Sequence, residues 1–188
     1  SSARSLAAAQ GILLNANENP WPPVSNAADT NTDSALNRYP EPQPQALVES
    51  LAALYAVDNQ QLLLTRGSDE GIDLLVRAFC RAGQDSIAIC PPCFGMYAIA
   101  AQIQNAGIQR IPLLAELGFL PDFDALAQCD AKLIFLCSPN NPTGNLLPRE
   151  QIIELAKQRA KDAIIVVDEA YIEFSPEMSL VRDLAHYP

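Results

Sequence analysis

The sequence predicts an α/β protein of three layers, in which helices cover both faces of a mainly parallel sheet. Two observations predict this class. From residue 44 onward, segments with apolar residues at helical spacing alternate with short apolar runs of strand length. These runs are continuously apolar rather than alternating, which indicates burial on both faces and therefore parallel pairing between layers of helices.

The elements follow one another after an irregular start. Residues 15–45 carry many prolines, asparagines and small polar residues, which indicates extended or loop-like chain. The helices that we predict are PQALVESLAALYA (44–56), SDEGIDLLVRAFCRAG (68–83, closed by Gly83), FGMYAIAAQIQNAG (94–107, ending at Gly107), PDFDALAQC (121–129) and PREQIIELAKQRAK (148–161). The strands that we predict are LLLT (62–65), SIAIC (86–90), IQRIPL (108–113), KLIFLC (132–137) and AIIVVD (163–168).

Composition and charge exclude several classes of partner. The chain has 188 residues, 49% of them hydrophobic, and a net charge of −10. This negative charge disfavours nucleic acid and anionic membranes as partners. No apolar run is long enough to span a membrane, and the run in SSARSLAAAQG is too short for a secretory signal, so we interpret this start as a frayed terminus or a cloning remnant. We expect a cytoplasmic protein.

Five cysteines, an odd number, argue against a disulfide framework. Cys90 and Cys93 form CPPC between a predicted strand and a predicted helix, where a thioredoxin-type redox pair would lie. The alternative is that two small, half-buried thiols simply line this junction. The only histidine, His186, is far along the chain, so we expect no metal site.

Three predicted strands end in segments of unusual chemistry, and ligands of open parallel sheets bind beyond such ends. After the first predicted strand, TRGSDEG places a glycine that permits a tight turn before the amides of Ser68 and Asp69. Free amides at the start of a helix bind phosphate. The alternative is an ordinary serine N-cap with acidic residues in the first turn of the helix.

The other two ends are polar as well. SPNNPTG (138–144) has the prolines, glycine and paired asparagines of turns, and either Pro139 or Pro142 could follow a cis bond. Asp168 emerges from a buried strand, and a carboxylate there needs a cationic or hydrogen-bonding partner. That partner is a ligand or, in the alternative, local backbone amides or a nearby arginine. A phosphate cradle, an amide and a carboxylate near a phenol suit a phosphorylated basic heterocycle, such as pyridoxal phosphate.

The motifs RYPEPQP, TRGSDEG, CPPCFGMY, SPNNPTG and VVDEAYIEF, in this order, resemble those of the fold-type I pyridoxal-phosphate aminotransferases. The segments NANENPWPP and PPCFGMY most resemble the histidinol-phosphate aminotransferases. The resemblance covers nearly the whole chain from Leu14 onward. It implies the large domain of the aspartate-aminotransferase type and the cofactor pyridoxal 5′-phosphate.

The resemblance also implies roles for single residues. Asp168 would pair with the pyridinium nitrogen of the cofactor and keep it protonated. Asn141 and Tyr171 would hydrogen-bond the 3-oxygen of the ring, and Phe94 would stack on the ring face. The amides of Ser68 and Asp69 would hold the phosphate.

Two further roles concern the other subunit and the substrate. Tyr39 would reach the cofactor phosphate of a second subunit, so the resemblance implies a homodimer with shared sites. The resemblance places Trp21 where the relatives usually have a tyrosine near the substrate phosphate, and its indole N–H would replace the phenol as a donor.

The family's chemistry needs a lysine in a Ser-Lys segment one strand beyond DEAY, and this chain ends at Pro188. Its three lysines, Lys132, Lys157 and Lys161, are predicted at the wrong edge of the sheet or on a solvent-facing helix. We therefore expect a truncated large domain, inactive alone, with residues 1–36 as an N-terminal arm and start of a small domain and residues 37–188 as a partial cofactor-binding domain.

For the parent enzyme, the resemblance implies transamination between L-histidinol phosphate and 2-oxoglutarate or glutamate in histidine biosynthesis. An aromatic or aspartate aminotransferase, or a threonine-phosphate decarboxylase, is the alternative within the same fold. A thioredoxin-like protein that uses Cys90 and Cys93 is an alternative of another class, and a non-catalytic binding or assembly fragment is the third.

Overall fold

A computed structural model describes residues 16–21, 37–184 and 186–187 of this chain. The chain divides into two compact units, residues 1–64 and residues 65–188, and each is described by itself. Among the described residues, no helix is both long enough and apolar enough to cross a membrane. Apart from residues 16–21, the predicted N-terminal arm lies outside the described residues, and the predicted domain boundary at residue 37 stays a prediction.

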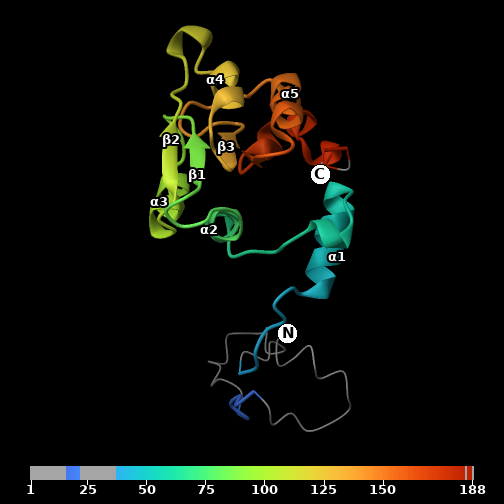
Figure 1. Ribbon diagram of the computed structural model, residues 1–188. Helices are drawn as coiled ribbons and strands as arrows, with labels where there is room; N and C mark the ends of the chain where they lie inside the picture. The colour runs from blue at the N-terminus through green and yellow to red at the C-terminus, as the bar shows by residue number, and fades with distance from the viewer. Residues whose placement is uncertain (1–15, 22–36, 185, 188) are drawn as a thin grey trace. The chain divides into compact units, whose positions relative to one another are not determined.

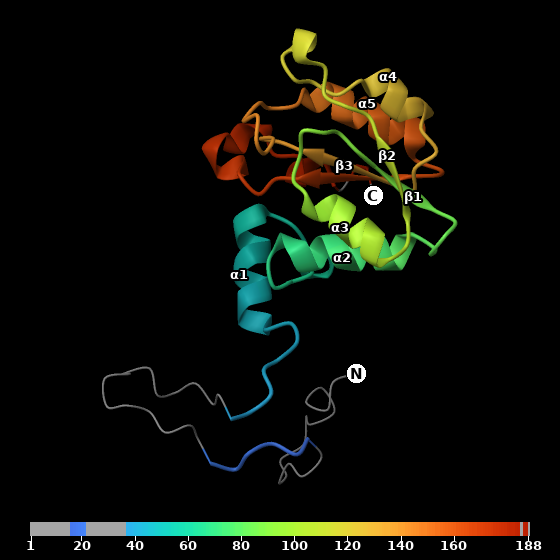
Figure 2. The ribbon, with the colours of Figure 1, turned by 90° about the vertical axis from the view of Figure 1, so that its left-hand side faces the viewer.

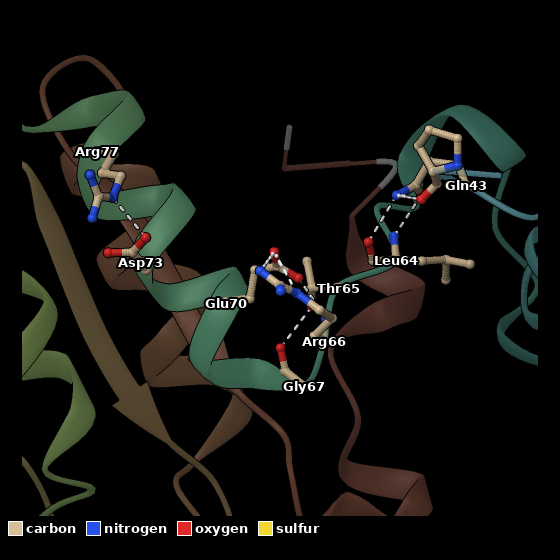
Figure 3. Close-up of polar contacts among 9 residues, drawn as sticks. Gln43, Leu64, Thr65, Arg66, Gly67, Glu70, Asp73 and Arg77 are labelled. Atoms are coloured by element: carbon tan, nitrogen blue, oxygen red, sulfur yellow. Dashed lines mark hydrogen bonds and ion pairs between the residues drawn. The ribbon is translucent and has the colours of Figure 1, made fainter. Parts of the chain in front are cut away.

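The first unit contains helix α1, Gln45–Tyr55, and a short 3-10 segment, Asn59–Gln61. The strand predicted at residues 62–65 is wrong: in the part of the chain that the structure describes, these residues pair with no other strand. The Gln43 side chain takes the place of a strand partner, because its Oε1 accepts from Leu64 N and its Nε2 donates to Leu64 O, both at 2.8 Å (Figure 3). Three leucines in a row indicate an extended chain but do not provide a neighbour.

The second unit alternates helices and strands as the sequence predicts. Its elements are α2 (Ser68–Phe79), β1 (Ser86–Ile89), α3 (Met96–Ile103), β2 (Gly107–Arg110), α4 (Phe123–Gln128), β3 (Leu133–Cys137), α5 (Arg149–Arg159) and β4 (Ile164–Asp168). All strand pairs are parallel, and the strand order is β2-β1-β3-β4. Helices α2 and α3 cover one face of the sheet, and α4 and α5 cover the other (Figures 1 and 2). The predicted three-layer α/β class is confirmed.

Alternate side chains of the strands fill two cores. In β3, Leu133 and Phe135 join the core beneath α2 and α3, while Ile134 and Leu136 join the core beneath α4 and α5. All four are at most 1% exposed. This division explains why the strand is apolar at every position: each face of the sheet meets a helical layer.

Two predicted helix ends are displaced by tight turns. Helix α2 ends at Phe79 rather than at Gly83, and α3 ends at Ile103 rather than at Gly107. Gly107 instead begins β2, where a Cβ atom would lie 3.0 Å from the Cβ of Ser86. This glycine therefore permits the close approach of two strands, which a sequence pattern does not distinguish from a helix end.

The turn between α2 and β1 provides a test of pH dependence. Asp85 accepts hydrogen bonds from Arg81 N at 2.7 Å and Arg81 Nε at 2.9 Å. These bonds, of which the side-chain bond has the largest effect, lower the pKa of the Asp85 carboxyl to about 2. Because the unfolded carboxyl titrates near pH ~3.9, this stabilisation is present above about pH 4 and is lost as the pH falls toward about 2.

We therefore expect Asp85→Asn to lower Tm near pH 7, and we expect its difference from the unsubstituted chain to shrink as the pH falls below about 4. Thermal melts over this range measure the difference. Asp130→Asn is the control, because the described residues provide no hydrogen bond to its carboxylate. A difference in Tm that stays constant down to about pH 2.5 would contradict the assignment.

Candidate functional site

The carboxyl ends of β3 and β4 and the start of α2 lie at one edge of the sheet. The parallel register pairs Cys137 with Asp168, so both strands end together. The Gln104 side chain, just after α3, donates to Cys80 O, just after α2, at 3.0 Å. Helix α3 runs from the carboxyl end of β1 to the amino end of β2, so Gln104 lies at the edge of the sheet where the strands begin. The bond therefore places the end of α2 at that edge. Ser68, at the start of α2, lies at the opposite edge, where β3 and β4 end.

The start of α2 has the geometry predicted for TRGSDEG. Gly67 precedes the helix with φ +81° and ψ 172°, a conformation open to glycine and strained for other residues. Thr65 Oγ1 donates to Gly67 O at 2.8 Å, and Glu70 accepts from Arg66 N at 2.6 Å (Figure 3). No side chain caps the helix, so the alternative of a serine cap is wrong.

The amides of Ser68 and Asp69 have no hydrogen-bond acceptor within the part of the chain that the structure describes. They belong to the first turn of a 12-residue helix, whose dipole favours an anion at this end. Both residues are exposed. The arrangement suits a phosphate, and the structure leaves this assignment a prediction.

Asp168 is half-buried at the end of β4, and its partners are neutral. Oδ2 accepts from the Tyr97 hydroxyl at 2.7 Å, and Oδ1 accepts from Ala170 N at 3.1 Å. No arginine, lysine or histidine among the described residues forms an ion pair with it. The nearby arginine that we considered in place of a ligand is therefore absent from the described contacts, whereas the local amide is present.

Tyr97 supplies the hydroxyl from the first turn of α3, and its side chain is 0% exposed. Its ring stacks on Phe135 with centroids 4.8 Å apart, and it forms a T-shaped contact with the ring of Phe94 at 5.8 Å between centroids. Burial, followed by the hydrogen bond to Asp168, raises the pKa of the Tyr97 phenol far above its usual range. The phenol is therefore a neutral donor near neutral pH.

The SPNNPTG loop is held by its first asparagine. Asn140 is 6% exposed, and its Nδ2 donates to Pro92 O at 3.1 Å and to Thr143 Oγ1 at 2.7 Å. The bonds before Pro139 and Pro142 are both cis, which confirms that prediction. The loop thus connects the end of β3 with the CPPC segment after β1.

The second asparagine lies beside a cavity. Asn141 Nδ2 donates to the Tyr171 hydroxyl at 3.4 Å, so two residues predicted to share one ligand atom do lie together. The cavity has a volume of about 400 Å³. It is lined by Pro139, Asn140, Asn141, Pro142, Gly144, Leu146, Tyr171, Phe174 and Ser175.

The structure leaves two predicted positions unassigned. Trp21 and Tyr39 are 76% and 62% exposed and belong to the first unit, so their relation to the strand ends stays a prediction. Arg38 beside Tyr39 forms an ion pair with Glu18 at 3.1 Å, which joins the RYP motif to NANENP. The contact connects two motifs that the sequence presents separately.

The cysteines do not have the properties of a redox pair. All five are free thiols. Burial raises the pKa of the Cys90 thiol to about 12 and also raises the pKa of the Cys93 thiol. A thioredoxin-type nucleophile needs a lowered pKa, so this geometry disfavours the redox alternative. Among the described residues, no group of histidine, cysteine and acidic side chains could hold a metal ion.

Comparison with known proteins identifies the family. The sequence model for aminotransferase class I and II matches residues 9–188. The chain belongs to this family. A histidinol-phosphate aminotransferase of Xylella fastidiosa strain 9a5c is 51% identical over 193 residues, which cover 100% of this chain and 52% of the relative. The chain thus spans about half the length of the curated relatives that it matches.

Solved structures agree with the family. The histidinol-phosphate aminotransferase from Clostridium acetobutylicum superposes with a TM-score of 0.71 at 26% identity, over 80% of this chain and 44% of that one. The L-threonine-O-3-phosphate decarboxylase from Porphyromonas gingivalis superposes with a TM-score of 0.59 at 31% identity, over 73% of this chain and 41% of that one. The large-domain fold that the resemblance implied is confirmed at this level.

Sequence reasoning did not assign a role to Tyr97 or to Asn140. Tyr97 appeared only as the last residue of CPPCFGMY, although it lies three residues after Phe94, whose ring it contacts; Phe94 itself precedes the first residue of α3. Asn140 appeared as one of two adjacent asparagines. Both line the cavity, and the local pattern does not show which of them is buried and holds the loop, and which contacts Tyr171.

Proposed function

We propose that this chain provides much of a pyridoxal 5′-phosphate site in an enzyme that transfers an amino group between L-histidinol phosphate and 2-oxoglutarate, as part of histidine biosynthesis in the cytoplasm. Membership of the aminotransferase family and 51% identity with a histidinol-phosphate aminotransferase support the proposal. Because the chain spans about half of such relatives, the activity is proposed for the whole protein and not for these residues alone.

The observation that carries the proposal is the carboxylate of Asp168 at the end of β4. It is half-buried, and both of its recorded partners, Tyr97 and the Ala170 amide, are neutral. A partly buried charge without a counter-charge is costly, so this site favours a cationic ligand. A protonated pyridine ring nitrogen is such a group, and the ring, when bound, accepts electrons from the substrate.

The neighbouring residues fit the remaining groups of the same cofactor. The amides of Ser68 and Asp69 suit its phosphate, because they are unsatisfied donors at a helix start. Phe94 offers an aromatic face beside Tyr97. Asn141 and Tyr171, 3.4 Å apart, offer two donors for one ring oxygen. We assign Tyr39 to the cofactor phosphate of a second subunit in a homodimer, and Trp21 to the substrate.

The lysines lie away from this site. Lys132 precedes β3, and its Nζ donates to Asp162 O at the starting edge of the sheet, at 3.3 Å. Lys157 is exposed on α5, 5.5 Å from the ring of Tyr187, and Lys161 is exposed after the helix. We therefore expect these 188 residues to bind the cofactor without a covalent bond and to show no transamination on their own.

A titration of the purified chain with pyridoxal phosphate tests the proposal. We expect the absorbance titration to show saturable binding. After borohydride reduction, we expect mass spectrometry to show the mass of the unmodified chain. Pyridoxal without its phosphate is the matched ligand, and it should bind more weakly because the α2 amides lose their anion. Absence of saturable binding, or a reduced adduct on one of the three lysines, would overturn this assignment of the site.

A further inference from the structure

We propose that Tyr97 is a positioning residue for the cofactor, which holds the Asp168 carboxylate so that it can receive the pyridinium nitrogen. The inference rests on the proposed function and deepens it. It assigns a role at this site to a residue that is itself too buried to touch a ligand, since its side chain is 0% exposed.

The hydrogen bonds of Asp168 set its orientation. The Tyr97 hydroxyl binds Oδ2 at 2.7 Å, and the Ala170 amide binds Oδ1 at 3.1 Å, so both carboxylate oxygens are fixed from the protein side. A carboxylate accepts about four hydrogen bonds, so each oxygen keeps a lone pair for a further donor. Bound at both oxygens, the side chain loses little further rotational freedom when a ligand arrives.

The donor itself is held rigidly. The Tyr97 ring stacks on Phe135 of β3, 4.8 Å between centroids and 15° between planes, and β3 is paired with β4 beside Asp168. Phe94, the residue predicted to stack on the cofactor ring, forms a T-shaped contact with Tyr97 at 5.8 Å between ring centroids. One buried side chain therefore links the residue assigned to the ring nitrogen with the residue assigned to the ring face.

A neutral donor suits this role better than a cation does. An arginine or lysine at this position would neutralise Asp168 and weaken its attraction for a protonated ring nitrogen. The phenol instead stabilises the carboxylate by a charge-assisted hydrogen bond and leaves its net negative charge unchanged. The structure thus combines a fixed carboxylate with an uncompensated charge, which is the combination that a cationic heterocycle needs.

Tyr97→Phe tests the role, because it removes the hydroxyl and keeps the stacked ring. Two probes are compared: pyridoxal phosphate, and its analogue in which a CH group replaces the ring nitrogen. We expect the variant to bind pyridoxal phosphate about tenfold more weakly, as for one lost hydrogen bond to a charged group, and to bind the analogue unchanged. Tyr55→Phe, which removes an exposed phenol in α1, should alter neither affinity.

The outcomes separate this inference from the proposed function. Equal weakening for both ligands, or no weakening for either, would assign Tyr97 to fold stability alone and overturn the inference. If the unsubstituted chain binds neither ligand, the proposed function fails and the inference fails with it. If the variant does not fold, the NMR resonance of the Tyr97 phenolic proton in the unsubstituted chain tests the inference instead. We expect pyridoxal phosphate to shift this resonance and the analogue to leave it in place. A resonance that pyridoxal phosphate does not shift would contradict the inference.

Discussion

Replacement of Asp168 by asparagine is expected to weaken the binding of pyridoxal phosphate about a hundredfold, or about 2.7 kcal/mol. The substitution removes the charge that faces the protonated ring nitrogen. It also presents an amide N–H₂ where Tyr97 or the Ala170 amide needs an acceptor, since both donate to this carboxylate. The lost charge-assisted bond and the disturbed orientation act in the same direction.

The affinity for pyridoxal phosphate is measured by absorbance or fluorescence titration. Glu173→Gln is the control, because it removes one negative charge from an exposed residue five positions away and leaves the Asp168 contacts intact. We expect the control to bind as the unsubstituted chain does. A hundredfold loss in both variants would mean that the net charge of the chain, rather than Asp168, governs binding, and an unchanged affinity in Asp168→Asn would remove the carboxylate from the site.

Replacement of Arg159 by methionine is expected to lower the free energy of unfolding by about 3 kcal/mol. Arg159, the last residue of α5, is 5% exposed. Its Nη1 donates to Leu126 O at 3.1 Å and Cys129 O at 2.6 Å, and its Nη2 donates to Ala131 O at 3.2 Å. Methionine keeps most of the side-chain length but leaves these carbonyls, which end α4 and lead into β3, without a donor.

Urea unfolding followed by circular dichroism measures this change. Arg77→Met is the matched control, because the Arg77 side chain is 53% exposed and, among the described residues, pairs only with Asp73 on the same helix. Such an exposed pair adds little to stability, because water and salt screen it. Equal stabilities for the two variants would show that the α4 carbonyls find other partners, and would contradict a structural role for the buried guanidinium.

Local pattern was sufficient for most of the second unit. The alternation of helices with continuously apolar runs predicted every strand from β1 to β4, because a parallel sheet between helical layers needs apolar residues on both faces. The same pattern failed at residues 62–65. LLLT has the composition of a strand, yet the backbone N–H and C=O of Leu64 form their hydrogen bonds with the Gln43 side chain. Composition describes how a segment is buried and does not say what lies beside it.

The amino-acid sequence was enough to predict the class of fold, the strand ends at which chemistry is concentrated, and the resemblance of five ordered motifs to one family. These are properties of neighbouring residues. Three features depend on the folded structure: which donors reach Asp168, which asparagine contacts Tyr171, and the burial of Arg159. Tyr97 and Asp168 are 71 residues apart, and their contact depends on how α3 packs across β3 against β4. Packing of this kind depends on the combined shapes of many side chains, which no single segment of the chain contains.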